Sequence, residues 1–348
     1  MTMTDSGFWP GRSALVTGAG GFVGSHVAAA LVRAGADVVT IVRDQPPQGG
    51  LELQGIAGQV TLISGSITDP AIVARVINEY EVDTVFHLAA QAMVIPANRD
   101  PVSTFESNIQ GTWNVLEACQ LSPLVGRVVV ASSDKAYGTQ PSLPYTEATP
   151  LLATNPYDVS KACADMLARS YHGVFDLPVV VSRCANIYGG GDINYSRLVP
   201  GTIRSALLGE RPVVRSDGTP LRDYIHVDDA VEAYLVLGER AADPAVSGNA
   251  YNFGANQPVA VLDLVRTILS ACGREDLDPL ILGHGKLRLE IDRQYLDSGR
   301  AERELGWRAR TTLAEGIATT VDWYRRHAEL VDRSAATVPT TAAPADPS

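Results

Sequence analysis

The sequence predicts an α/β protein, a doubly wound parallel sheet followed by a smaller and more irregular α/β region. From Ser13 to about Val181, short β-branched runs alternate with longer helical patterns. These runs are apolar at successive positions, as strands must be when helices cover both faces of a parallel sheet. Beyond Asn186 the alternation gives way to loops rich in glycine and proline, which indicates a different kind of packing.

The expected elements follow from these patterns in chain order. The strands are the segments SALVTG, DVVTIV, VTLISG, TVFHLA, RVVVASS and PVVVSR. Helices are expected at 24–34, 70–80, 101–120, 156–175, 197–208 and 227–240. Thr312 and Glu315 have capping-box spacing before a last amphipathic run. We expect two interleaved domains, 10–182 and 183–330, and then a disordered tail, 331–348, because that segment is small, polar and proline-bearing.

Composition narrows the class of ligand. The formal net charge of −11 repels polyanions, which argues against nucleic acid or an anionic membrane as the main partner. A phosphorylated ligand must therefore be held by local positive groups. The four cysteines and six histidines show neither a disulfide framework nor metal-ligand spacing, so no metal is expected. No apolar run reaches the roughly 20 residues that span a bilayer, and we expect a cytoplasmic protein.

A glycine-rich segment, ALVTGAGGFVGSH, follows the first expected strand and opens a helix. Its Gly18, Gly21 and Gly24 allow a tight turn and a close approach of the backbone to a pyrophosphate. The helix N-terminus adds free N–H groups and the positive end of a dipole. The segment therefore predicts a Rossmann-type dinucleotide-binding domain.

The ends of the second and third strands bear on the choice of dinucleotide. Asp44 would bind the adenine ribose hydroxyls of NAD, whereas Arg43 would accommodate the 2′-phosphate of NADP. Both cofactors stay open, with NAD favoured. Ser66 and Ile67 are expected beside the adenine. The expected cofactor-binding residues are Gly18, Gly21, Phe22, Val23, Gly24, Arg43, Asp44, Ser66, Ile67, Leu88, Ala89, Ala90, Tyr157 and Lys161.

The segment NPYDVSKACADM carries a candidate proton-transfer pair. Tyr157 and Lys161 are four residues apart and so lie on one helix face, with Asn155 as the expected N-cap and Pro156 as the first helical residue. A tyrosine with its ordinary pKa of about 10 is a poor base at neutral pH, and a nearby lysine charge lowers that pKa. This pair predicts a base that takes a proton from a sugar hydroxyl while hydride leaves for a nicotinamide.

Five segments together, TGAGGFVGSH, FHLAAQ, SSDKAYG, YDVSK and RDYIHVDD, resemble the extended short-chain dehydrogenase/reductase family of NAD-dependent epimerases and dehydratases. The resemblance implies a triad of Ser133, Tyr157 and Lys161, with Ser133 bonding the sugar C4 oxygen. Within the family, the Asp134-Lys135 pair and the segment NIYGGGDINYSRLVP are most similar to the CDP-glucose 4,6-dehydratase group. The segment SDGTPLRDYIHVDD and Ser66 depart from the expected pattern, which leaves the nucleotide base and the sugar open.

The group that the chain resembles oxidises a sugar at C4, removes water across C5–C6 and returns the hydride to C6. Oxidation at C4 acidifies the C5 hydrogen, so water loss needs one acid and one base close together. We expect Asp134 to be the acid and Lys135 to be the base. A 4-epimerase of the same family is the alternative, since it uses the triad without this pair. A further alternative, from a different functional class, is a non-catalytic protein of the same fold that senses a dinucleotide.

The resemblance also implies substrate contacts and an assembly. Arginine suits bidentate contact with a nucleoside diphosphate. The helices that carry Trp113 and Tyr171 resemble the family's four-helix dimer interface, so a homodimer is expected, although an intrachain core role fits both residues equally well. His87 is expected to be structural. The expected substrate-binding residues are Asn186, Arg197, Arg222, Asn252 and Arg293.

Overall fold

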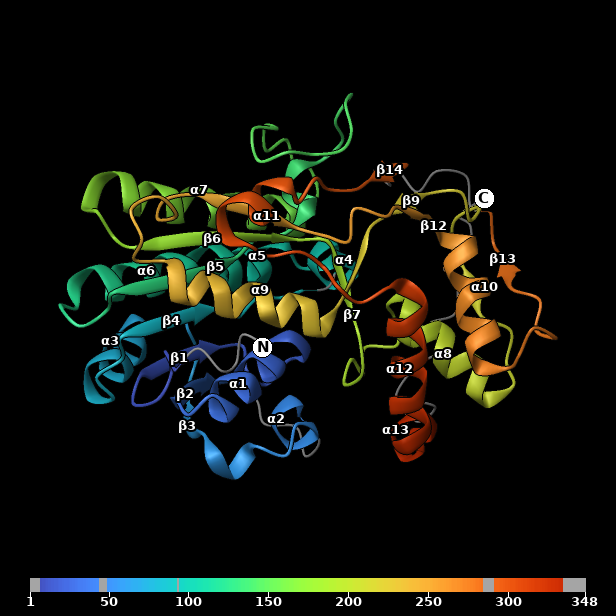
Figure 1. The fold of residues 1–348 in the computed structure, drawn as a ribbon, viewed down its shortest axis with the longest axis horizontal. Helices are drawn as coiled ribbons and strands as arrows, with labels where there is room; N and C mark the ends of the chain where they lie inside the picture. The colour runs from blue at the N-terminus through green and yellow to red at the C-terminus, as the bar shows by residue number, and fades with distance from the viewer. Residues whose placement is uncertain (1–6, 44–48, 93, 284–290, 334–348) are drawn as a thin grey trace, which may run out of the picture.

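The computed structural model describes residues 7–43, 49–92, 94–283 and 291–333. Its centre is a seven-stranded parallel sheet in the order β11-β6-β5-β4-β1-β2-β3 (Figure 1). The predicted fold class is confirmed, and all six predicted strands are present. The seventh strand, β11, is contributed by the second half of the chain. The strands are β1 (Ser13–Thr17), β2 (Asp37–Val42), β3 (Thr61–Ser64), β4 (Thr84–His87), β5 (Arg127–Ala131), β6 (Val179–Cys184) and β11 (Ala250–Phe253).

Successive residues of the central strands enter two hydrophobic cores, one on each face of the sheet. Val129 of β5 belongs to the core under helices α1 and α9. Its neighbours Val128 and Val130 belong to the core under α3 and α6. Side chains alternate along a strand, which explains why neighbouring positions of the predicted strands are both apolar. The helices are α1 (Phe22–Arg33), α3 (Pro70–Glu79), α6 (Gly111–Leu121) and α9 (Val227–Arg240).

Two helix starts illustrate how local sequence sets the boundaries. Helix α7 (Pro156–Phe175) has the predicted bounds, and Asn155 is its N-cap residue. The Asn155 side chain makes no capping bond, however, because its amide donates to Asp158 Oδ2 at 3.2 Å. Helix α12 (Leu313–Arg326) begins with the predicted capping box, in which Thr312 and Glu315 bond each other's backbone N–H groups.

The helix predicted at 101–120 is not a regular α-helix throughout. It consists of α5 (Pro101–Phe105), a π-helical stretch (Glu106–Gln110) and α6. The buried Asn108 in the π-helical stretch accepts from the Gln91 backbone N–H at 2.6 Å and donates to the Gln91 carbonyl at 3.2 Å. Such π-bulges occur frequently at functional sites. Here the bulge ties the helix to the loop that follows β4.

Part of the second half forms a smaller body, on the right in Figure 1, whereas α11 (Gly299–Leu305) packs against β11 and α9 at the central sheet. Four helices surround a third hydrophobic core. The first residues of the predicted tail are helical rather than disordered, because Val331 is buried in this core, and residues 334–348 lie outside the described residues. The helices are α8 (Leu198–Leu208), α10 (Val261–Cys272), α12 and α13 (Ala328–Arg333).

Short strands form three small sheets outside the central one. The sheets pair β7 (Asn186–Tyr188) with β10 (Tyr224–His226), β8 (Val213–Val214) with β13 (Leu280–Ile281), and β9 (Leu221–Arg222) with both β12 (Val259–Ala260) and β14 (Arg293–Gln294). Within the described ranges, no helix is both long and apolar enough to cross a bilayer. Those ranges also contain no group of three or more His, Cys, Asp or Glu placed to hold a metal ion.

Candidate active site

A cavity of about 770 Å³ lies at the carboxyl ends of the parallel strands. Its lining includes the residue that follows each of four strands: Gly18 after β1, Leu88 after β4, Ser132 after β5 and Ala185 after β6. Ligands of doubly wound α/β proteins bind at this edge of the sheet. The smaller body closes the cavity on the opposite side, with residues such as Arg197 at the start of α8.

The glycine turn between β1 and α1 has no room for side chains at two of its predicted positions. Gly18 has φ +79°, and a Cβ there would lie 2.7 Å from the Ala89 backbone nitrogen. A Cβ on Gly24 would lie 2.2 Å from the Gly18 carbonyl oxygen. Gly21 is the N-cap residue of α1, and it lines the cavity together with the first residues of that helix. A helix N-terminus at a cavity wall suits a dinucleotide pyrophosphate.

We expect Gly18→Ala to weaken NAD binding and to lower the free energy of unfolding. The left-handed backbone alone costs a residue with a Cβ roughly 1–2 kcal/mol, and the contact with Ala89 forces the turn to move. Gly58→Ala is the control, since a Cβ there meets no atom within 4 Å. Calorimetry with NAD and chemical denaturation measure both effects. Equal behaviour of the two variants would contradict the role of the Gly18 conformation.

Nearly all of the predicted cofactor-binding residues line this cavity. Asn114 of α6 donates to the Ile67 carbonyl at 3.0 Å and so fixes the loop that follows β3. Ser66 in the same loop bonds Thr68 at 2.8 Å. Asp44 lies outside the described residues. The predicted residues that line the cavity are Gly18, Gly21, Phe22, Val23, Gly24, Arg43, Ser66, Ile67, Leu88, Ala89, Ala90, Tyr157 and Lys161.

The predicted triad also lies in the cavity, with Tyr157 and Lys161 on α7 and Ser133 just after β5. Burial raises the pKa of Tyr157 to about 12, although Arg197 and a hydrogen bond with Ser133 act in the opposite direction. The expectation of a lowered tyrosine pKa is therefore wrong. Burial also lowers the pKa of Lys161 to about 8, and its amine donates to the Ala131 carbonyl.

The predicted acid and base lie on the turn Asp134–Tyr137 next to the triad. Ser133 Oγ donates to Asp134 Oδ1 at 3.1 Å and accepts from the Lys135 backbone N–H at 3.3 Å. Asp134 is 1% exposed, and its Oδ2 has no hydrogen-bond partner among the described residues. Buried polar atoms are nearly always paired, so this oxygen marks a position where a ligand atom is expected.

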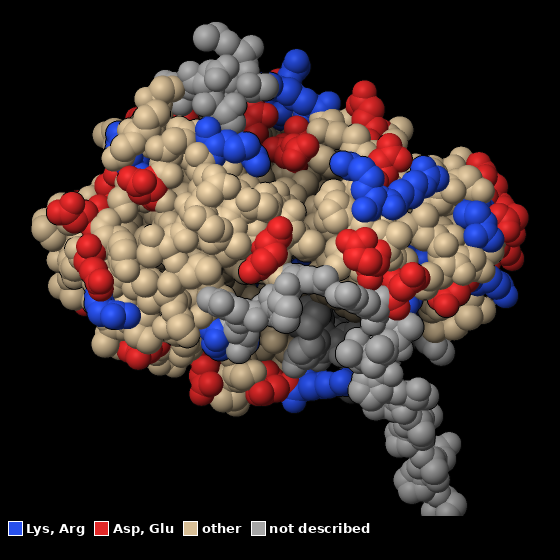
Figure 2. Space-filling model, turned by 90° about the horizontal axis from the view of Figure 1, so that it is seen from below, with Lys and Arg blue, Asp and Glu red and all other residues tan. Residues whose placement is uncertain are grey.

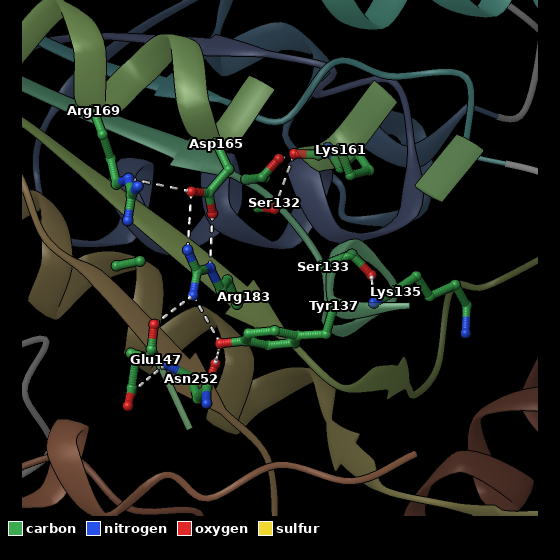
Figure 3. A network of polar contacts seen from close by, with 12 residues as sticks. Ser132, Ser133, Lys135, Tyr137, Glu147, Lys161, Asp165, Arg169, Arg183 and Asn252 are labelled. Atoms are coloured by element: carbon green, nitrogen blue, oxygen red, sulfur yellow. Dashed lines mark hydrogen bonds and ion pairs between the residues drawn. The ribbon is translucent and has the colours of Figure 1, made fainter. Parts of the chain in front are cut away.

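A buried polar network fixes the turn relative to α7 (Figure 3). Arg183 of β6 donates to both carboxylate oxygens of Asp165, at 2.7 and 3.0 Å, and to the Tyr137 hydroxyl at 2.8 Å. Asp165 is one turn beyond Lys161 on α7, and Tyr137 ends the turn that carries Asp134. The triad and the acid–base pair are thereby held against each other by one guanidinium group.

Two of the five predicted substrate-binding residues, Arg197 and Asn186, line the cavity. Arg197 donates to Asp192 Oδ2 at 3.0 Å, and Asp192 lines the cavity as well. Asn186 donates to the Asp223 carbonyl at 3.0 Å. Burial raises the carboxyl pKa of Asp192, whereas Arg197 lowers it. This end of the cavity therefore presents a cation and an amide to a ligand.

The other three predicted substrate-binding residues do not line the cavity. Asn252 is fully buried below it, where its amide accepts from Tyr137 and donates to the Tyr145 carbonyl. Arg222 in β9 donates to the Leu221 carbonyl at 2.9 Å, and Arg293 in β14 is exposed. The predicted substrate role of Asn252 is thus corrected to a structural one, because each of its side-chain polar atoms is used inside the protein.

Arg215 lines the cavity although it is absent from the predicted set. It follows β8 directly and has no hydrogen-bond or ion-pair partner among the described residues. The sequence signal that could have identified Arg215 is its position directly after β8. That strand has two residues, which is too short to be predicted from its pattern. The cavity therefore has two arginines from the smaller body, Arg197 and Arg215.

His87 is a structural residue, as predicted. It ends β4, where its two ring nitrogens contact the hydroxyls of Thr17 and Thr112 at 2.8 and 2.9 Å. Burial lowers the pKa of this imidazole to about 3. A histidine with both nitrogens occupied and no accessible charge change supports the sheet rather than proton transfer.

Acidic and basic side chains are interspersed over the face shown in Figure 2, in keeping with the net charge of −11. Inside the cavity, by contrast, Arg197 and Arg215 of the smaller body lie at the wall. A guanidinium group suits a phosphorylated ligand because its planar donors match two phosphate oxygens at once.

Comparison with known proteins places the chain in a family. The sequence model of GDP-mannose 4,6 dehydratase matches residues 15–320. A dTDP-glucose 4,6-dehydratase of Mycolicibacterium smegmatis is 34% identical over 319 residues, which cover 89% of this chain and 92% of that protein. A trifunctional UDP-glucose 4,6-dehydratase, epimerase and reductase of Arabidopsis thaliana is 30% identical over 334 residues. These cover 94% of this chain and 49% of that protein, so the chain spans about half the length of the plant relative.

Solved structures of the same architecture carry the expected ligands. A UDP-glucose 4-epimerase of Thermotoga maritima with UDP-glucose has a TM-score of 0.83 and 28% identity, covering 91% of this chain and 100% of that one. A dTDP-glucose 4,6-dehydratase of Streptomyces venezuelae with NAD bound has a TM-score of 0.82 and 28% identity, covering 92% and 99%. NAD is thus confirmed as the cofactor of this group of enzymes. With a family match over residues 15–320, the chain belongs to the GDP-mannose 4,6-dehydratase family of NAD-dependent epimerases and dehydratases, the extended short-chain dehydrogenase/reductases.

Proposed function

We propose that this chain is a nucleotide-sugar 4,6-dehydratase, which oxidises the sugar at C4, removes water across C5–C6 and returns the hydride to C6. One observation carries the proposal: Asp134 and Lys135 line the same cavity as Tyr157 and Lys161. The buried, unpartnered Asp134 Oδ2 supports it further. A simple oxidation or a 4-epimerisation has no need of a second acid and base beside the triad.

The oxidation step falls to the triad. NAD, held by the glycine turn and the loops after β3 and β4, would supply the hydride acceptor. Ser133 would donate a hydrogen bond to the C4 oxygen, and Tyr157 would take the hydroxyl proton. Because burial raises the pKa of Tyr157 to about 12, its phenolate has to be favoured by positive charge in the loaded cavity. Arg197 acts in this direction on the pKa of Tyr157, and Lys161 lies one turn further along α7 in the same cavity.

The elimination step falls to Asp134 and Lys135. Lys135 would take the C5 proton, the C5–H electron pair would form the C5–C6 double bond, and the C6–O bond would break. Asp134 would give its proton to the departing hydroxyl, which leaves as water. Only three of the chain's 28 basic residues are lysines, and two of them, Lys135 and Lys161, line this cavity. Arginine cannot be deprotonated in proteins, so lysine is required where an amine must act as a base.

The nucleotide end of the substrate is proposed to lie against Asn186, Arg197 and Arg215. Arg197 and Arg215 would share the diphosphate, and Asp192 would hold Arg197 in place. NADP stays an alternative to NAD for this chain, since Arg43 lines the cavity. A cytidine diphosphate hexose is the substrate to test first, because the Asp134-Lys135 pair resembles that group.

A 4-epimerase is the second candidate, and the structural similarity to a UDP-glucose 4-epimerase supports it. The two reactions differ in mass balance, because only the dehydratase loses water. The test is to incubate the protein with NAD and CDP-glucose, UDP-glucose, dTDP-glucose or GDP-mannose, and to measure the mass of the nucleotide sugar afterwards by mass spectrometry. Loss of water from one sugar is the expected result. A product of identical mass would establish the epimerase instead, and no turnover of any sugar would favour a non-catalytic role.

We propose that the chain forms a homodimer through α6 and α7, while the cytoplasmic location stays a prediction. Trp113 on α6 and Met166 on α7 are 42% and 59% exposed, on helices that contact each other. Met166→Lys should therefore yield a monomer, because a charge would enter an apolar interface. Val213→Lys on β8, also an exposed apolar position, is the control. Sedimentation velocity separates the two results, and a wild-type monomer would refute the interface.

A further inference from the structure

The side chain of Gln294 contacts both members of the proposed acid–base pair. It is 1% exposed and belongs to β14, 159 residues beyond Lys135 in the sequence. Its Nε2 donates to the Asp134 carbonyl at 2.9 Å, and its Oε1 accepts from Lys135 Nζ at 3.3 Å. One amide therefore holds the backbone of the first residue and the amine of the second.

The backbone around Gln294 is anchored to the segment that follows the acid–base turn. The Tyr145 backbone N–H donates to the Tyr295 carbonyl at 3.0 Å, and the Asp297 backbone N–H donates to the Tyr145 carbonyl at 2.8 Å. The Tyr145 ring packs against that of Tyr137, with centroids 5.1 Å apart, and its hydroxyl bonds the Gly138 carbonyl. The strand that carries Gln294 and the turn that carries Lys135 thus form one packed unit.

The chemistry of an amide differs from that of the other side chains that could fill this position. A carboxylate would favour the charged ammonium of Lys135 and oppose its action as a base. An apolar side chain would not hold the amine at all. An amide oxygen is a neutral acceptor that receives an N–H from either the ammonium or the free amine. It therefore fixes the amine in both protonation states and leaves the lone pair of the free amine to the cavity.

We propose that Gln294 is a positioning residue of the elimination step, which holds Lys135 in the cavity without neutralising it. The inference rests on the proposed dehydratase function, in which Lys135 takes the C5 proton and Asp134 protonates the departing hydroxyl. Gln294 makes no contact with the sugar in this role. Its effect is therefore confined to the elimination and absent from the oxidation.

The test is a pair of substitutions at Gln294, studied with NAD and the nucleotide sugar that the wild type converts. In Gln294→Glu, the midpoint of the pH profile for water loss should lie about one pH unit or more above that of the wild type. A neighbouring opposite charge shifts a titration by that amount. In Gln294→Met, water loss should slow by roughly 10- to 100-fold, since a misplaced catalytic group costs that much. Hydride transfer to NAD, followed by absorbance in a single turnover, should stay at the wild-type rate in both.

Gln140→Glu and Gln140→Met are the matched controls. Gln140 donates to the Tyr137 carbonyl at 2.7 Å, so it supports the same turn, but at the end away from Lys135. An unshifted pH profile in Gln294→Glu, or an equal shift in Gln140→Glu, would overturn the positioning role while leaving the dehydratase function intact. If Gln294→Met does not fold, the pH profile of Gln294→Glu decides alone. A wild-type protein that releases no water refutes the proposed function itself.

Discussion

Tyr157→Phe is expected to lower turnover by roughly 10²- to 10⁴-fold, the usual contribution of a general acid or base. The substitution removes the phenol oxygen and keeps the ring, so the packing of α7 and the affinity for NAD should stay nearly unchanged. Burial raises the pKa of this phenol to about 12, and the base is the deprotonated form. Hydride transfer in the wild type should therefore become faster as pH rises through the neutral range, and this dependence should be lost in the variant.

The measurement is single-turnover absorbance of the reduced nicotinamide over a range of pH, with calorimetry for NAD affinity. Tyr171→Phe is the matched control, because Tyr171 lies on the same helix, outside the cavity, and its hydroxyl bonds Glu117 at 2.8 Å. Appreciable turnover in Tyr157→Phe, or a pH dependence like that of the wild type, would exclude Tyr157 as the base.

Local sequence is sufficient for the framework of the cavity. The apolar strands, the glycine turn and the four-residue spacing of Tyr157 and Lys161 are all signals within a few residues of each other. In a parallel sheet the carboxyl ends of the strands meet at one edge, so residues that follow the strands are brought together by topology alone. That is why Ser133 and Leu88 can be placed at the same site without knowledge of any contact between them.

The features that escape prediction depend on contacts between distant segments. Strand β11 has four residues and is defined by its pairing with β6 rather than by its own pattern. Asn252 within it accepts a hydrogen bond from Tyr137, 115 residues earlier, and does not line the cavity. Gln294 likewise contacts Lys135, which lies 159 residues earlier in the sequence. Spacing in the sequence carries no information about such pairs.

The charged candidates show the same limit. Arginines are expected because a diphosphate needs them, yet Arg222 and Arg293 lie on the small sheet of β9 and β14 rather than in the cavity. Arg215, seven residues before Arg222, lines the cavity instead. The need for arginine at the nucleotide end can therefore be predicted from chemistry. Which arginine lines the cavity depends on the path of short strands in the smaller body, and local sequence does not determine that path.

The largest difference between the candidate reactions should appear in Asp134→Asn and Lys135→Met. Both substitutions nearly preserve size, and in Asp134→Asn the carbonyl oxygen of the new amide would still accept from Ser133 Oγ, as Asp134 Oδ1 does at 3.1 Å. Hydride transfer to NAD should therefore persist. Water loss should slow by roughly 10²- to 10⁴-fold, the usual value of one general acid or base.

The result would be an accumulation of reduced nicotinamide together with the 4-keto sugar, because the hydride cannot return to C6 until the C5–C6 double bond exists. Single-turnover absorbance follows the first species and mass spectrometry the second. Lys135→Arg sharpens the test, since it keeps the positive charge but cannot act as a base. If Lys135 only supplies charge, Lys135→Arg should lose water at the wild-type rate. If Lys135 takes the C5 proton, Lys135→Arg should stall at the 4-keto stage, as Lys135→Met does. Rapid water loss in Lys135→Met would remove Lys135 from the elimination altogether.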